Sequence, residues 1–167
     1  MSSDRQPAPV RRRVQARLRH AQRGVMAVEF ALMFLFGMLP VLLLTLTGVL
    51  TFAAKQSLTL AAAEGARAAL RYGNPAERAA TACSTARQSM QWLLTFTNDT
   101  DPCASGAITV SPLGVCPSTP AAQCMTVTTS FDYNAHPFLP GTQALYGWVL
   151  GHQITRSATV QLDTQGN

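Results

Sequence analysis

Glu29 is the residue of this chain whose type and position most strongly indicate chemistry. It lies five positions after Gly24 and directly before Phe30, and it is the only ionisable side chain between Arg23 and Lys55. A carboxylate in a membrane helix costs on the order of 2.5–3.5 kcal/mol at the bilayer centre and less near an interface. We therefore expect Glu29 to have either a charged partner or a function that offsets this cost.

Four cysteines form the second group of chemically distinctive residues, and all of them follow residue 82. An even number of cysteines confined to one part of a chain is typical of disulfides formed outside the cytoplasm. No CxxC pair occurs, which argues against a zinc site or a thioredoxin-type site. Three pairings are possible. We favour Cys116 with Cys124 as a short loop closure and Cys83 with Cys103 as a link from helix to sheet, and four buried free thiols are the alternative.

The other reactive residue types form no recognisable catalytic or ligand-binding motif. His20, His136 and His152 lack metal-ligand spacing, and the chain contains neither a GxSxG nucleophile motif nor a glycine-rich phosphate loop. The acidic residues form no pair suited to acid–base chemistry. We therefore expect no enzymatic activity, no metal site and no cofactor.

The apolar segment that contains Glu29 is long enough to cross a bilayer. The 25 residues 30–54 carry no charge, and about 20 residues at 1.5 Å rise suffice for a hydrocarbon core of roughly 30 Å. We predict a transmembrane helix over residues 25–54. Pro40 lacks the amide that would donate to the carbonyl of Phe36, so we expect a kink there.

Most of the net positive charge lies before the apolar segment. Residues 1–24 contain seven arginines and one aspartate, a formal charge of +6, whereas the whole chain carries +5. Basic residues beside the first hydrophobic segment keep that end in the cytoplasm. We expect residues 1–24 to be a cytoplasmic leader and residues 55–167 to be exported. Basic tails also bind nucleic acid, but this one has no interleaved aromatic residues, and we expect no nucleic-acid partner.

The helix is expected to continue past the membrane over residues 55–73. Leu58, Ala62, Gly65 and Ala69 share one face, at offsets of 0, 4, 7 and 11 positions. A face of small residues allows close approach of backbones. It could pack against the chain's own domain or against neighbouring subunits.

Residues 74–167 are expected to form one exported domain. Asn74, Pro75 and Glu77 have the order of an N-cap, a first-turn proline and a capping-box glutamate. They predict a second helix that runs to about Phe96. Its predicted core stripe consists of Ala76, Ala80, Cys83, Met90 and Leu94.

The rest of the domain has the period of β-strands. Alternating apolar and polar residues predict strands over residues 108–111, 125–133 and 154–162. A sheet with one apolar face needs a cover, which the preceding helices can supply. The expected fold is α+β, with a long N-terminal transmembrane helix, a second helix and a small antiparallel sheet of about three strands.

Two stretches of the chain resemble a known family. Gly24, followed at the fifth position by Glu29 and then by Phe30, resembles the processing site of class III prepilins. The run AAEGARAA over residues 62–69 is similar to that of TadE-like minor pseudopilins from tight-adherence (Tad/Flp, type IVb) pilus assembly systems. The resemblance is specific over residues 22–72 and weaker beyond. The chain departs from many members in having Val25 directly after Gly24, as the first mature residue, and in its long, arginine-rich leader.

The resemblance implies that a membrane-embedded prepilin peptidase cleaves after Gly24, so that Val25 becomes the first mature residue. The new α-amine would lie four residues before Glu29, about 6 Å away along the helix and on the same face. This carboxylate would receive the amine of an adjacent subunit. Implied partners are the prepilin peptidase, other pseudopilins and pilin, the inner-membrane pilus assembly platform and membrane lipid. The implied location is the inner membrane, with a cytoplasmic N-terminus and a periplasmic domain.

Two other interpretations of the apolar segment stay open. An unprocessed single-pass, signal-anchored envelope protein with a periplasmic binding or structural domain would keep its N-terminus, and Glu29 could then pair with Arg23. A cleaved secretory signal would use residues 61–63 before Glu64 as the peptidase site. The apolar region is longer than such a signal by about ten residues.

Overall fold

The computed structural model describes residues 24–71, 73–117, 119–143 and 153–162. The chain divides into two compact units, the first up to Thr45 and the second from Leu46 onward. The described part of the first unit is helical throughout. Residues 24–33 are α-helical, a π-helical turn η1 (Phe34–Met38) follows, and α2 (Leu39–Ala68) begins here and continues into the second unit.

The π-helical turn lies directly before Pro40, whose ring nitrogen has no hydrogen to donate. The N–H of Leu39 donates to the carbonyl of Phe34, five residues back, instead of to a carbonyl four residues back. The sequence predicted a kink at Pro40, and the structure places a helical irregularity in the turn that precedes it. One widened turn thus accommodates the proline before the α-helix resumes.

One helix among the described residues, Gly24–Ala68, is long and apolar enough to cross a membrane. Its residues are exposed over positions 24–46, except for the half-buried Leu39. These 23 positions would extend about 35 Å at 1.5 Å per residue, against roughly 30 Å for a hydrocarbon core. They form a candidate single membrane span, because apolar side chains exposed on all sides need lipid or apolar protein around them.

The described residues of the second unit form an antiparallel sheet of four strands centred on β3 (Gln123–Asp132). β1 (Ile108–Val110) and β2 (Gly114–Val115) pair with one edge of β3, and β4 (Gln153–Leu162) pairs with the other edge along its whole length. The predicted α+β class is confirmed. β2 was not expected, because two residues are too few to show alternation.

Alternate side chains of β3 enter the core. Every second residue from Met125 to Phe131 is buried, and the residues between them are partly exposed. Val127, in the middle of this series, is opposite Val110 on β1 and Ala158 on β4, which also pack against the core. The residues between the buried ones, Thr126, Thr128 and Ser130, lie on the other face, as the period of two predicted. Thr129 is the one polar residue of this stretch on the core face.

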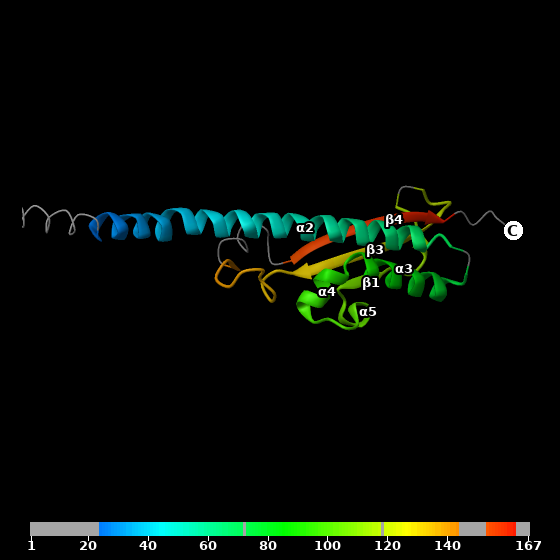
Figure 1. Cartoon of the computed structure of the whole chain (residues 1–167). Coiled ribbons are helices and arrows are strands. Elements are labelled where there is room, and N and C mark those ends of the chain that lie inside the picture. Colours follow the sequence, from blue (N-terminus) through cyan, green and yellow to red (C-terminus); the bar gives the residue numbers. More distant parts are fainter. Residues whose placement is uncertain (1–23, 72, 118, 144–152, 163–167) are drawn as a thin grey trace, which may run out of the picture. The chain divides into compact units, whose positions relative to one another are not determined.

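Three further helices precede the sheet in sequence: α3 (Pro75–Ser89), α4 (Gln91–Thr97) and α5 (Pro102–Ser105). Figure 1 shows the arrangement of these elements: α2 contacts β3, while α3 and α5 both contact β1. The predicted single helix up to Phe96 is therefore wrong, because the chain breaks the helix at Met90, where φ is −115° and ψ is 20°. Neither glycine nor proline marks this break, so the sequence pattern did not show it.

The capping box at the start of α3 is confirmed. The side chain of Asn74 accepts from the backbone N–H of Glu77 at 2.8 Å, and the Glu77 carboxylate accepts from the N–H of Asn74 at 3.1 Å. The preceding helix ends at Ala68, five residues before the expected end at Gly73. The Arg78 side chain donates to carbonyls past this end, at Ala69 and Gly73.

α2 packs on the sheet through its face of small residues. Leu58, Ala62, Gly65 and Ala69 are all buried, which places this face within the chain's own domain, the first of the two alternatives. The hydroxyl of Thr129, a polar residue on the core face of β3, donates to the carbonyl of Leu58 at 3.0 Å. This hydrogen bond ties the central strand to the helix.

Gly65 lies where α2, α3 and β3 meet. A Cβ atom at this position would be 3.0 Å from the carbonyl oxygen of Ala82 and 3.1 Å from side-chain atoms of Ala86 and Val127. Only glycine allows this approach without displacing neighbours. Because Ala82 and Ala86 meet α2, they define the core face of α3, and the predicted stripe is wrong at Ala76 and Ala80, which are exposed.

Replacing Gly65 by leucine should destabilise the second unit, because the new side chain would have to displace α3 and β3. Overpacking of this kind costs about 1–3 kcal/mol, and the thermal unfolding midpoint of the full chain in detergent should fall by several degrees. Thr59→Leu, at an exposed position of the same helix, is the matched control. Equal midpoints for the two variants would contradict the close contact at Gly65.

Candidate processing and assembly site

The residues of the expected processing motif lie together at the start of the described helix. Gly24, Val25, Glu29 and Phe30 are all helical and exposed. Gly24, Val25 and Glu29 border the same shallow hollow on the helix surface. The helical conformation therefore puts the first expected mature residue and the carboxylate on one face.

The Glu29 carboxylate has no ion-pair partner within the described parts of the chain. Arg23, the alternative partner, lies outside those parts. The side chain projects from a helix surface that is otherwise apolar for many turns. An acidic group in such surroundings strongly favours contact with a positive charge over solitary burial.

Both favoured disulfides are present. Cys83 is bonded to Cys103 across a Cα–Cα distance of 6.3 Å, and Cys116 is bonded to Cys124 across 5.0 Å. The second bond closes the short loop between β2 and β3, as expected. The first differs from expectation in one respect, because it links α3 to α5 instead of linking a helix to the sheet.

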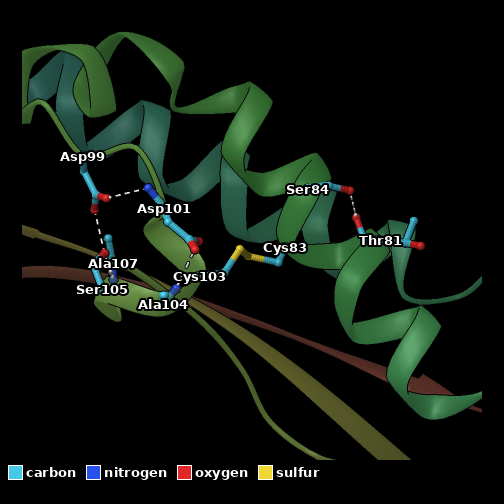
Figure 2. Close-up of a disulfide and its surroundings, with 9 residues drawn as sticks. All are labelled: Thr81, Cys83, Ser84, Asp99, Asp101, Cys103, Ala104, Ser105 and Ala107. Carbon is cyan, nitrogen blue, oxygen red and sulfur yellow. Dashed lines mark hydrogen bonds between the residues drawn. A yellow bond between two sulfur atoms is a disulfide. The ribbon is translucent and has the colours of Figure 1, made fainter.

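Figure 2 shows that hydrogen bonds within the chain surround the Cys83–Cys103 bond. Asp101 is the N-cap of α5 and accepts from the N–H of Ala104 at 3.3 Å. Asp99 accepts from the N–H of Asp101 at 3.0 Å and from the Ser105 hydroxyl at 2.6 Å. These carboxylates shape the turn that carries Cys103, which gives them a structural role.

A surface cavity of about 430 Å³ lies beside this turn, and its lining includes Leu94, Asp99, Phe131, Asp132 and His136. Asp132 accepts two backbone N–H groups of the following turn, at 2.9 and 3.1 Å, so both acidic residues of the lining are bound to their own loops. The described residues contain no group of three His, Cys, Asp or Glu that could hold a metal ion. His20 and His152 lie outside the described residues.

Sequence reasoning missed an aromatic cluster centred on Phe138. The ring of Phe138 lies 6.2 Å from Trp92, 5.2 Å from Phe96, 5.4 Å from Phe131 and 5.7 Å from Tyr133, measured between centroids. The rings come from α4, β3 and the loop after β3, so no local period connects them. Their spacing in sequence gave no signal, and only the tertiary fold brings them together.

The structure thus gathers Gly24, Val25, Glu29 and Phe30 on one helix of the first unit and places both disulfides in the second. No family model matches the chain, no curated protein is significantly similar to it in sequence, and no solved structure significantly matches its fold.

The two disulfides should be separable by mutation. In Cys83→Ser, Cys103 should react with iodoacetamide without prior reduction, while Cys116 and Cys124 should stay protected until a reductant is added. Mass mapping of the alkylated peptides gives the result. Early alkylation of Cys116 or Cys124 in this variant would contradict the pairing.

Cys83→Ser and Cys116→Ser should lower the free energy of unfolding by similar amounts. In the chain-entropy model, sequence separations of 20 and 8 residues correspond to about 3 and about 2.5 kcal/mol. Cys83→Ser should therefore lower the free energy of unfolding at least as much as Cys116→Ser. Denaturant titration of the oxidised full chain in detergent measures both values, and a larger loss for Cys116→Ser would contradict this order.

Proposed function

We propose that this chain is a TadE-like minor pseudopilin, processed after Gly24 by a prepilin peptidase and required for the assembly of a Flp-type type IVb pilus used in surface attachment. The observation that carries the proposal is the placement of Glu29, a lone carboxylate one helical turn after Val25 on an exposed apolar helix. The resemblance of residues 62–69 to TadE-like proteins is a second, separate support. The chain would act by assembly and not as an enzyme.

Two features favour cleavage by a peptidase directly after Gly24. Glycine has no side chain to obstruct entry of the backbone into a peptidase cleft. Among the described residues, no atom apart from those of its neighbours and of its own helix backbone lies within 4 Å of the position that a Cβ of Gly24 would take. The arginines before it would hold the leader on the cytoplasmic side. A peptidase with its active site at that membrane surface could then reach the bond between Gly24 and Val25.

Cleavage would create a positive charge that the uncut chain lacks at this point. The α-amine of Val25 and the carboxylate of Glu29 would each be costly in lipid without a partner. If a neighbouring subunit is shifted along the helix axis until its amine meets Glu29, both charges are neutralised. Two apolar helices can pack against each other at many positions along their axes. The ion pair between the amine and Glu29 would select one of these positions and so set the register between subunits.

The second unit supports an exported location. Both of its disulfides require an oxidising compartment to persist, and the arginine-rich leader favours a cytoplasmic N-terminus. Together they support a location in which the candidate span crosses the inner membrane and the second unit is periplasmic. The partners would be prepilin peptidase, other pseudopilins and pilin, and the inner-membrane assembly platform.

The packing of α2 disfavours a cleaved secretory signal. Cleavage after Ala63 would remove Leu58, Ala61 and Ala62 from the core, where all three are buried. It would also remove the carbonyl that accepts the hydrogen bond from Thr129. The remaining product would expose the core face of the sheet to water.

Mature protein from cells with an active prepilin peptidase should begin at Val25, which intact mass and N-terminal sequencing of the membrane fraction measure. Gly24→Leu should block cleavage because its side chain obstructs the cleft. Gly37→Leu, at a helix position with open space around it, should be processed normally. An N-terminus at Met1 or Ser2 would identify an unprocessed signal anchor, and one at Glu64 a cleaved secretory signal.

Glu29→Gln should insert and be processed but should abolish or strongly reduce piliation, because the amide cannot neutralise the α-amine of a neighbour. Piliation is counted by electron microscopy after equal protein levels have been verified. Glu64→Gln is the matched control, since Glu64 forms an exposed ion pair with Arg67 at 2.7 Å, and such pairs contribute little. Wild-type piliation in Glu29→Gln would contradict the proposal that Glu29 sets the register between subunits.

A further inference from the structure

The stretch of α2 that opens the second unit has one covered face and one bare face. Thr47 and Thr51, one helical turn apart, are 0% and 4% exposed. Val49 and Phe52, on the other side of the helix, are 68% and 62% exposed. No charged residue occurs on either face before Lys55.

The bare face indicates where the helix leaves the hydrocarbon. If the lipid ended near Leu46, Val49 and Phe52 would be left in water, and burial of side chains of this size contributes about 1.5–3 kcal/mol each. Lipid is therefore expected to cover the bare face up to about Lys55, whose ammonium group can reach phosphates of the headgroups. The covered face, which carries Thr47 and Thr51, belongs to the same stretch of helix and therefore lies at the same depth in the bilayer as Val49 and Phe52. The part of the second unit that covers Thr47 and Thr51 must then lie at or below the membrane surface.

We propose that the second unit is seated in the interfacial layer of the bilayer that α2 enters, through an aromatic patch formed by Trp92, Phe96 and Phe138. Trp92 and Phe96 are 41% and 44% exposed. Phe138 contacts both rings and holds them in place. Tryptophan is enriched at membrane–water interfaces, where its ring is apolar and its N–H finds a polar partner, and phenylalanine is common on the lipid-facing side of interfacial helices.

A direct hydrogen bond fixes the level of the patch along α2. The indole N–H of Trp92 donates to the hydroxyl of Ser57 at 3.1 Å, and that hydroxyl donates to the carbonyl of Ser89. Ser57 is two residues past Lys55, which corresponds to about 3 Å along the helix. The patch therefore lies at the depth where the charge-free stretch ends.

The upper acyl and headgroup layer is a better occupant for this patch than a second copy of the chain. The helix that enters the lipid is hydrogen-bonded to the patch, so the lipid surface is present at the patch without any association step. The only condition is that α2 crosses a bilayer. Pilus assembly is not needed, and failure of the proposed function would leave this placement intact.

Trp92 can report on its own surroundings, because the chain has only two tryptophans, Trp92 and Trp148. Full-length Trp148→Phe protein is reconstituted at low density in phosphatidylcholine vesicles, either plain or brominated near the headgroup end of the acyl chains. We expect a marked loss of Trp92 emission in the brominated vesicles. Equal emission in the two kinds of vesicle would overturn the proposal.

The control reporter is placed just past the far end of the same helix. Leu70 is exposed and lies two residues after Ala68, the last residue of α2, which is about 20 Å along the helix from Lys55. In a variant with both native tryptophans changed to phenylalanine, Leu70→Trp should show the same emission in plain and brominated vesicles. Quenching at position 70 equal to that at Trp92 would overturn the proposal, because it would show that the contact is not specific to the patch.

A charge in the patch should weaken the contact. Phe96→Glu in the Trp148→Phe background should reduce the quenching of Trp92, and retention of both disulfides shows that the unit has folded. Thr95→Glu, at the exposed neighbouring position, is the matched control and should retain more quenching. If Trp92 emission is equal in plain and brominated vesicles but changes with protein density, the patch binds a second copy and the lipid placement is wrong. Should Phe96→Glu fail to fold, the quenching of Trp92 in Trp148→Phe already decides the question.

Discussion

The close approach of α2 to α3 and β3 at Gly65 joins the candidate membrane span to the rest of the chain. α2 begins in the first unit and ends in the core of the second, so one element belongs to both. At Gly65 the neighbouring backbone and side chains leave no space for even a methyl group without adjustment. The hydrogen bond from Thr129 to the carbonyl of Leu58 fixes the helix against the central strand. A helix held in this way cannot slide along the sheet without breaking the core.

The features that sequence predicted correctly are those determined by neighbouring residues. The capping box of Asn74 and Glu77 needs only residues three positions apart, and the alternation of β3 needs only a period of two. The Cys116–Cys124 bond joins residues only eight positions apart, so they lie close together whatever the fold. The face of small residues on α2 was also predicted from the sequence, but the surface against which it packs was not. Packing against the chain's own domain and packing against neighbouring subunits would both use the same small residues.

The features that sequence did not predict depend on contacts between distant segments. The break at Met90 carries neither glycine nor proline, and the side chain of Met90 is buried in the core at the break, a contact that local preference does not reveal. Thr129 occupies a core position because the carbonyl of Leu58, 71 residues away, accepts its hydroxyl hydrogen. For the processing motif, sequence supplied Gly24 and Glu29, and the structure adds their exposure and shared face. The partner of Glu29 belongs to another molecule in the proposed function, so no feature of one chain can display it.

The two proposals have a common physical consequence for a subunit that leaves the bilayer. Its first unit would lose the lipid around an exposed apolar helix, and its aromatic patch would lose the interface at the same moment, because Ser57 on α2 is hydrogen-bonded to Trp92. Each apolar side chain moved from lipid to water costs about 1.5–3 kcal/mol, so extraction is feasible only into another apolar environment. Neighbouring helices in a filament would provide one, and Glu29 would select the axial position at which they do so. The contact at Gly65 holds the second half of α2 in the core of the second unit, so a force that pulls α2 out of the bilayer acts on that unit as well.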